Sequence, residues 1–393
     1  MTTGQSSRSS RTKEPSATDH QEIEWQFDAS ELEPVEGWLD QHNSGSSGLF
    51  IAPESTIEIT DTYYDTDDWR FYRAGYALRV RNTAGAVEAT MKSLTPAEGS
   101  LRRRREISEP LEDDKPSTLK QAGGAVGERS RTLVGGREMR PLFTLETRRQ
   151  GFALLLEGST DRNQEDVRIG EISLDTSKIP LGEVTARLTR VEVEAGIGMA
   201  PTPELLDFVD EMQSALELTP ASISKYEAGL YASGLNPKGD SEFGPTHVDP
   251  SMNLGEVAFA VLRTQFAEMQ NHEPGTRLGE DPEELHDMRV PTRRMRAAMK
   301  VFEEALPERA SWLRDELRWV ARALADVRDL DVQIERFQTW QEEADEESFG
   351  FLDRILTITH KRRAEARKNM LETLDSVRYE RLLSSFAEML RLG

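Results

Sequence analysis

The sequence predicts an α+β protein in which an antiparallel β-barrel with flanking helices is followed by an all-α helical-bundle domain. Short runs that alternate apolar and polar residues recur from about residue 20 to 232, and many short strands of this kind are typical of barrels and sandwiches. From 251 to 393 the apolar residues recur at helical spacing instead. We therefore expect a disordered tail over 1–19, a strand domain over 20–232, a linker over 233–250 and a helical domain over 251–393.

Composition excludes several classes of protein. The 393 residues contain no cysteine and six histidines, and no histidines are paired as in HExxH, so disulfides and thiol chemistry are excluded and a zinc site is disfavoured. The net charge of −22 argues against non-specific nucleic-acid binding. No apolar run approaches the roughly 18–20 residues that span a bilayer, and the N-terminus lacks the apolar core of a secretory signal. We expect a cytoplasmic protein without a membrane segment.

The first domain is expected to contain mainly strands. The alternating runs are EIEWQF, STIEITDTYYD, YALRVR, VEATMKS, RRRREIS, FTLETRRQ, FALLLEG, RIGEISLD and RLTRVEVEA. One helix is expected after Ser30, with Glu33 placed for a capping box, and another after Thr202, with Pro203 at its first position. The segment LNPKGDSEFGPTHVDP has no periodicity and separates this domain from the helical one.

Charged residues share one face of several predicted strands, because side chains alternate along a strand. These residues are Glu22 and Glu24 in the first run, Arg79 and Arg81, Lys92, Arg102, Arg104 and Glu106, Glu146 and Arg148, and Arg190, Glu192 and Glu194 in the last. On composition alone, a solvated sheet face with mixed charges is the simpler explanation. However, ExE occurs twice, which suits a hard cation, and paired arginines suit phosphate. If the barrel closes with this face inward, the charges line its interior and helices cover its apolar outer face.

The helical domain carries a basic stripe beside its apolar stripe. In PEELHDMRVPTRRMRAAMKVF, the basic positions lie one residue, or about 100°, away from the apolar positions, and Pro291 is expected to kink or restart the helix. Similar basic faces are expected on the segments LRDELRWVARALADVRDLDVQ and HKRRAEARK. Three basic faces in an acidic chain suggest a common anionic ligand, and solvated helix faces explain them equally well.

The strand domain resembles the CYTH, or triphosphate tunnel metalloenzyme, family. EIEWQF is similar to its ExExK motif, YYDTDDWRFYRAGYALRVRN to the strand pair that ends in RxR, and SLRRRREISEPL, GEISLD, RVEVE and SKYEAGL to later elements in order. The resemblance implies Mg²⁺ or Mn²⁺ held by Glu22, Glu24, Glu192 and Glu194, with Asp175 at a second metal. It implies phosphate binding by Arg79, Arg81, Lys92, Arg104, Arg148, Arg190 and Lys225. Catalysis would depend on Glu22, Glu24, Lys92, Arg79 and Arg81.

The chain departs from this motif at Gln26, which stands where the family has lysine. The lost charge-assisted hydrogen bond would be worth about 1.5–3 kcal/mol. The resemblance is therefore compatible with a slower enzyme, an altered substrate preference, or a protein that only binds.

The helical domain resembles CHAD domains, through ELHDMRVPTRRMRAAMKVF, LRWVARALADVRDLDVQ and LDSVRYERLLSSF. The resemblance implies binding of inorganic polyphosphate by His286, Arg289, Arg293, Arg296, Arg318 and Arg322. CHAD domains commonly hold two helical halves, and only one is expected here. Such a half would expose apolar surface, which favours a homodimer.

Three functions follow from these expectations. The first is metal-dependent hydrolysis of inorganic triphosphate or polyphosphate in the barrel, with the helical domain as an anchor for the substrate. In that case the protein is expected in the cytoplasm, including on polyphosphate granules. The second is a polyphosphate-binding protein without turnover. The third is nucleotide cyclisation in the same barrel. The P-loop signature GxxxxGK[ST] is absent from the sequence, which argues against a P-loop ATPase.

Overall fold

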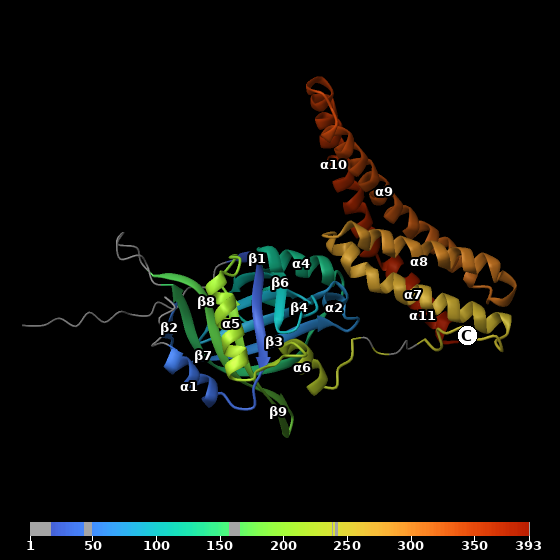
Figure 1. Ribbon diagram of the computed structural model, residues 1–393. Coiled ribbons are helices and arrows are strands. Elements are labelled where there is room, and N and C mark those ends of the chain that lie inside the picture. The colour runs from blue at the N-terminus through green and yellow to red at the C-terminus, as the bar shows by residue number, and fades with distance from the viewer. Residues whose placement is uncertain (1–16, 43–48, 157–165, 238, 240–242, 393) are drawn as a thin grey trace, which may run out of the picture. The chain divides into compact units, whose positions relative to one another are not determined.

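The computed structural model describes residues 17–42, 49–156, 166–237, 239 and 243–392 (Figure 1). Contacts divide the chain into two compact units, with the main boundary between Asn236 and Pro237; Thr132–Arg137 group with the second unit. The expected N-terminal tail lies mostly outside the described residues, but Thr18 already starts the first strand. Between residues 232 and 254 the described residues form no helix or strand.

The first unit contains a closed antiparallel β-barrel, which confirms the predicted fold class (Figure 1). Eight strands follow one another around it, and the last pairs with the first. In spatial order they are β1 (Thr18–Asp28), β6 (Leu101–Leu111), β5 (Ala86–Ser93), β4 (Tyr76–Thr83), β3 (Ile57–Thr66), β7 (Met139–Leu156), β8 (Val167–Leu181) and β9 (Val184–Ala195). Two short strands, β2 (Leu49–Pro53) and β10 (Thr219–Pro220), pair with β7 and β1.

The apolar side of the first strand faces outward, under two helices. Ile23, Trp25 and Phe27 pack in one buried cluster with residues of α1 (Glu33–His42) and α5 (Pro203–Ala215). Burying large apolar side chains contributes about 1.5–3 kcal/mol each. The helices therefore cover the barrel's apolar outer face, as expected, and leave the polar side of β1 to the interior.

The helix ends agree only in part with expectation. At the start of α5, the Thr202 side chain accepts a hydrogen bond from the Leu205 N–H, and Pro203 occupies the first turn. By contrast, α1 begins at Glu33, and the carbonyl of Leu32 accepts the Glu36 N–H, so Ser30 is not the cap. Helices α2 (Arg70–Arg73), α3 (Pro116–Gln121), α4 (Ala125–Val134) and α6 (Lys225–Ala232) were not expected.

The second unit is helical, as predicted. It contains α7 (Leu254–Leu278), α8 (Pro282–Val301), a 3₁₀ turn η2 (Glu303–Ala305), α9 (Ala310–Glu342), α10 (Glu346–Leu374) and α11 (Val377–Arg391), which share one apolar core. Asp281 caps α8 as expected. No helix among the described residues is both long and apolar enough to span a membrane.

Pro291 was expected to kink or restart the helix; it lies inside a continuous α8, so it does not restart it. A proline removes one backbone hydrogen bond and costs about 3 kcal/mol in a helix interior. Leu285, Met288 and Met295 on the same helix are buried in the core, so their packing opposes a break. Tertiary packing therefore outweighs the local preference of proline.

Candidate functional site

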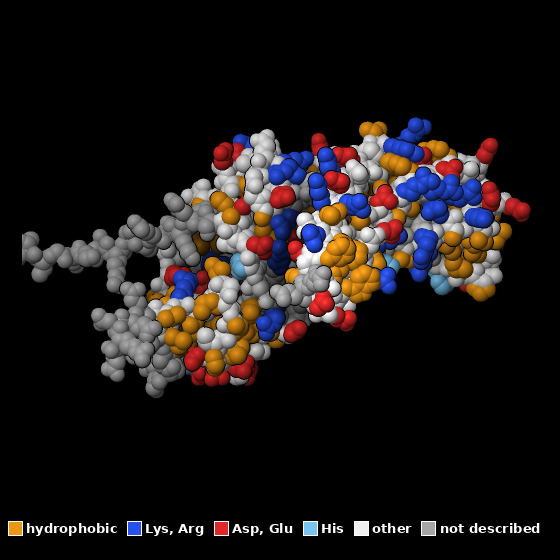
Figure 2. All heavy atoms as spheres, turned by 90° about the horizontal axis from the view of Figure 1, so that it is seen from above, with side chains coloured by type: hydrophobic (Ala, Val, Ile, Leu, Met, Phe, Trp, Pro, Cys, Tyr) orange, Lys and Arg blue, Asp and Glu red, His pale blue; other side chains and the backbone are white. Residues whose placement is uncertain are grey.

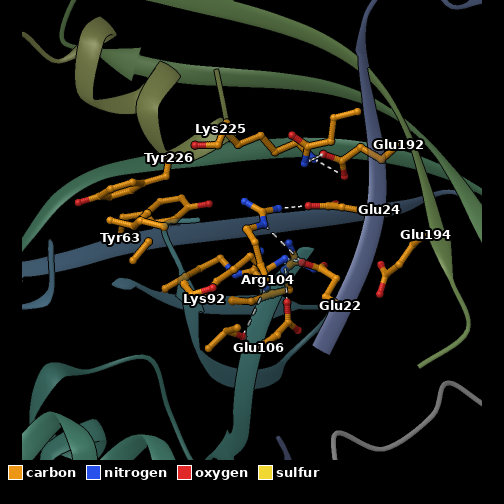
Figure 3. A pocket seen from close by; sticks show the side chains of 18 of the residues that line it. Glu22, Glu24, Tyr63, Lys92, Arg104, Glu106, Glu192, Glu194, Lys225 and Tyr226 are labelled. Carbon is orange, nitrogen blue, oxygen red and sulfur yellow. Dashed lines mark hydrogen bonds and ion pairs between the residues drawn. The ribbon is translucent and has the colours of Figure 1, made fainter. Parts of the chain in front are cut away.

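A cavity inside the barrel gathers most of the predicted tunnel residues (Figure 3). Its lining residues come from all eight barrel strands and from the start of α6. The predicted residues that line it are Glu22, Glu24, Gln26, Arg79, Arg81, Lys92, Arg104, Glu192, Glu194 and Lys225. The charged faces of β1, β4, β5, β6 and β9 therefore point inward, and a solvated sheet face is wrong for them, whereas Glu146 and Arg148 on β7 are exposed.

The pair Arg79 and Arg81 is held by an acidic residue that the sequence analysis did not single out. Arg81 donates two hydrogen bonds of 2.8 Å to the carboxylate of Asp61, and Arg79 Nε lies 3.7 Å from the same group. Although burial opposes it, these two guanidinium groups hold the pKa of Asp61 far below its ordinary value. Asp61 lies in the β-branched run IEITDT, on the opposite face of the strand from the run's other acid, Glu58, and this was the signal that could have identified it.

A second set of cations neutralises the carboxylates of β1. Lys92 Nζ lies 2.6 Å from Glu22 Oε1 and 2.7 Å from Glu106 Oε2, and Arg104 pairs with Glu24. Burial opposes a charged Lys92, yet Glu106 and Glu22 raise its pKa. Glu106 also lines the cavity; RRRREIS places it on the same face as Arg104, but it was not among the residues predicted for the site.

A row of carboxylates crosses three neighbouring strands. Glu24 on β1 lies opposite Glu194 on β9, which lies opposite Glu171 on β8. Like charges directly opposite each other are destabilising. Burial, with the charges of Glu22 and Glu171, raises the pKa of Glu194 to about 8. Glu22 Oε2 is buried without a hydrogen-bond partner.

These oxygen donors fit a hard divalent cation in chemistry, because such ions take carboxylate ligands and would relieve the repulsion. Within the described part of the chain, no three acidic or histidine side chains are grouped closely enough to hold a metal ion as they stand. Lys92 and Arg104 occupy oxygens of Glu22 and Glu24 instead. A cation would therefore bind beside Glu194 and Glu171 only as these ion pairs loosen.

Asp175 and Glu192 are engaged differently from the expected metal ligands. Arg149 donates to both oxygens of Asp175, at 2.8 and 2.6 Å, and Lys225 pairs with the same carboxylate. Lys225 also lies 2.8 Å from Glu192. Asp175 is fully buried and does not line the cavity, because two cations already cover its oxygens. We therefore assign Asp175 to orienting Arg149 and Lys225.

The expected phosphate ligand Arg148 lies on the wrong face. Its side chain is exposed on the outside of β7, whereas Arg149 points into the cavity. A doublet of arginines offers one guanidinium to each face of a strand. Arg149 lies opposite Asp175 on β8, so Arg149 is the arginine that faces inward. This register depends on the pairing with β8 rather than on the local sequence.

Arg190 lies behind the cavity wall rather than on it. The residue is fully buried, and it donates hydrogen bonds of 2.8 Å to Asp28 and to the Ile223 carbonyl. Its Nη1 also lies 3.3 Å from Gln26 Oε1. The structure thus places Arg190 beside a lining residue, one step removed from any ligand in the cavity.

Aromatic rings close one part of the cavity wall. Tyr63 and Tyr226 line it with ring centroids 5.4 Å apart, and Tyr63 stacks on Phe143 at 4.8 Å (Figure 3). Helix α6 brings in both Lys225 and Tyr226, and Ser224 and Glu227 form its capping box. The missed signal was SxxE in SKYE, which predicts a helix start.

A basic groove on the second unit gathers all six residues predicted for the helical domain. Figure 2 shows many Lys and Arg side chains on the visible face of this unit. The groove residues are His286, Arg289, Arg293, Arg296, Arg318 and Arg322 from α8 and α9, and an adjoining hollow adds Lys300 and Arg314. Burial, with the charges of Arg318 and Arg322, lowers the pKa of Arg296. Asp315 pairs with Arg318 at 2.9 Å and Asp329 lies 3.9 Å from Arg289, so acidic neighbours offset only part of the positive charge of the groove.

The third predicted basic face has a structural role. Arg367 donates to the carbonyls of Thr276, at 3.2 Å, and of Arg277 and Leu278 at the end of α7. Arg363 pairs with Asp331 on α9. These side chains satisfy the free carbonyls of a helix end and bind α10 to its neighbours.

Comparisons with known proteins agree with this architecture. A model of the CYTH domain matches residues 34–227, and a model of the CHAD domain matches residues 260–393. One similar solved structure is a putative adenylate cyclase from Bacillus halodurans (19% identity, 53% of this chain and 97% of that chain covered, TM-score 0.35). Another is the putative adenylyl cyclase HpAC1 from Hippeastrum, described as having a dominant triphosphatase activity (14% identity, 55% of this chain and 97% of that chain covered, TM-score 0.36). A third is the RNA triphosphatase Pct1 from S. pombe (15% identity, 55% of this chain and 81% of that chain covered, TM-score 0.23). The chain carries a CYTH domain followed by a CHAD domain.

Proposed function

We propose that the barrel binds inorganic triphosphate, or the end of a polyphosphate chain, and hydrolyses it with Mg²⁺ or Mn²⁺. The strongest support is that one cavity contains both cations and carboxylates. The cations belong to Arg79, Arg81, Lys92 and Arg104, and the carboxylates belong to Glu24, Glu194 and Glu171. Phosphoryl transfer requires that the charge on the phosphate oxygens be neutralised and held in place. A cavity with both sets can do this.

Each set has its own part in the reaction. Arg79 and Arg81, which Asp61 orients, would bind phosphate oxygens through paired N–H groups. Lys92 and Arg104 would turn from Glu22 and Glu24 to the substrate, and so free these carboxylates together with Glu194 for the cation. A bound Mg²⁺ or Mn²⁺ supplies charge neutralisation and lowers the pKa of the water that attacks phosphorus. Lys225 and Arg149 would hold a further phosphate beside Glu192.

The experiment that tests this function measures orthophosphate release from tripolyphosphate with Mg²⁺ or Mn²⁺, beside tripolyphosphate affinity. Arg81→Ala should lower the affinity about tenfold or more, since it removes a charge-assisted pair of hydrogen bonds. Arg103→Ala, which removes an exposed arginine from the outer face of β6, should change neither quantity. Binding without orthophosphate release would leave a non-catalytic polyphosphate-binding protein. Pyrophosphate release from ATP would instead indicate cyclisation.

The helical unit is proposed to bind polyphosphate along its basic groove. The double change Arg293→Glu and Arg296→Glu should weaken binding of long-chain polyphosphate about tenfold or more and flatten its salt dependence, because two attractive charges become repulsive. The matched control is Lys361→Glu, an exposed position on α10 outside the groove. Binding assays at several salt concentrations would show the difference. Equal losses in both variants would contradict a specific groove.

A further inference from the structure

The side-chain amide of Gln26 is hydrogen-bonded to a buried arginine, Arg190. On the inner side of the barrel, Gln26 lies opposite Glu192, and in the next row Asp28 lies opposite Arg190. Arg190 Nη1 donates to Gln26 Oε1 at 3.3 Å, and Gln26 Nε2 donates to Glu192 Oε1 at 3.0 Å. The amide therefore accepts from a cation at one end and donates to a carboxylate at the other.

Glutamine is the side chain that this neighbourhood accommodates. A lysine ammonium has three donors and no acceptor, so it could not receive the hydrogen bond from Arg190. It would also add a positive charge beside a guanidinium that is fully buried and already repels Arg102. Two like charges at close range inside a protein cost several times what they cost in water. With Arg190 in place, Gln26 avoids this cost and a lysine would not.

Arg190 also lowers the pKa of Glu192, one of the carboxylates that line the cavity. Although burial opposes it, Lys225, Arg149 and, more weakly, Arg190 lower the pKa of Glu192. The amide nitrogen of Gln26 carries a second N–H beyond the one given to Glu192. Since Gln26 lines the cavity, this N–H is available to a phosphate oxygen, and hydrogen bonding of the amide oxygen to Arg190 strengthens it as a donor.

We infer that Arg190 and Gln26 act as one unit: the buried guanidinium supplies the positive charge, and the amide relays it to a phosphate in the cavity. Arg190 is thus a positioning residue, held by Asp28 and by the Ile223 carbonyl, and it touches the substrate only through Gln26. This inference rests on the proposed function, because it names the group that recognises one phosphate. It also explains how the cavity would bind a phosphate without a lysine at position 26.

The test is a cycle of three variants: Gln26→Lys, Arg190→Gln and the two combined. The unfolding temperature is measured without ligand, and tripolyphosphate affinity is measured by calorimetry without metal. Gln26→Lys should lower the unfolding temperature when Arg190 is present and raise it when Arg190 is Gln. Arg190→Gln should weaken tripolyphosphate binding about tenfold, and the combined variant should regain most of that loss. Arg187→Gln, an exposed change on the same strand, should alter neither quantity.

Several outcomes would overturn the inference. One is an effect of Gln26→Lys with the same sign and size in both backgrounds. Another is an Arg190→Gln protein that binds tripolyphosphate as tightly as the unchanged protein. If Arg190→Gln does not fold, Arg190→Lys keeps the charge, and Gln26→Lys should remain destabilising beside it; a stabilising effect there would also overturn the inference. Failure of the unchanged protein to bind tripolyphosphate would instead refute the proposed function, while the unfolding temperatures still test the Arg190–Gln26 pair.

Discussion

Replacing Asp61 by Asn should lower the free energy of unfolding by about 3–5 kcal/mol, which is the usual cost of removing one partner from a buried ion pair. The carboxylate is almost fully buried and balances two guanidinium groups, of Arg79 and Arg81. An amide keeps the shape but leaves both cations without an acid. For a domain of this size the expected fall in unfolding temperature is roughly 10 °C.

The difference between the two proteins should depend on pH. The pKa of Asp61 is depressed in the folded state, so its stabilising contribution is fully present above its ordinary value of 3.8. That contribution is lost as the pH falls through the lower folded value. The gap in stability between the unchanged protein and Asp61→Asn should therefore be constant near neutral pH and narrow in strong acid.

Thermal unfolding of Asp61→Asn between pH 7 and about pH 2, compared with Asp40→Asn, would check this prediction. Asp40 is exposed on α1, so its replacement should change the unfolding temperature little. A loss of stability in Asp61→Asn no larger than in Asp40→Asn would show that Arg79 and Arg81 do not depend on this carboxylate. Tripolyphosphate affinity should fall together with stability, because the two guanidinium groups lose the residue that orients them.

Glu194→Gln should abolish metal-dependent hydrolysis, with a loss of about a hundredfold or more, and yet leave the metal-free protein at least as stable. Glu194 faces Glu24 and Glu171 across the sheet, so its ionised form is repelled without a cation. The amide removes that repulsion and also removes a metal ligand. Loss of activity with unchanged or increased stability is the signature of a metal ligand, since a structural residue would lose both.

Glu192, two residues earlier on the same strand, provides the matched comparison. It is paired with Lys225 and Arg149, so Glu192→Gln should lower the unfolding temperature of the metal-free protein. The measurements are orthophosphate release from tripolyphosphate and the unfolding temperature with and without Mn²⁺. Mn²⁺ should raise the unfolding temperature of the unchanged protein but not of Glu194→Gln. Full activity in Glu194→Gln would rule out the carboxylate row as the metal site.

Local patterns predicted much of this molecule. Alternation of period two placed Glu22 and Glu24 on one side of a strand and Trp25 on the other, and the structure has them so. The helical period likewise separated a basic stripe from the core stripe of α8 by one residue. Both patterns depend on the geometry of a single element, which neighbours in the chain determine.

The same local reasoning failed where the partner of a side chain is distant in sequence. Arg367 follows the same basic periodicity as the groove residues, but it hydrogen-bonds the end of α7, roughly ninety residues away. Arg148 and Arg149 are adjacent, and only pairing with Asp175 shows which of them faces inward. Helix α6 was missed as a helix because it is short and because strand-like segments precede it.

The sequence by itself determined the two kinds of domain, the division of β1 into a charged and an apolar face, and the basic stripe of α8, since each follows from local periodicity. Only the tertiary structure decided which charges meet: the row of Glu24, Glu194 and Glu171, and the contact of Arg190 with Gln26. These contacts depend on strand register and barrel closure. Register and closure are set by the packing of side chains that lie far apart in the chain, so no local pattern predicts them.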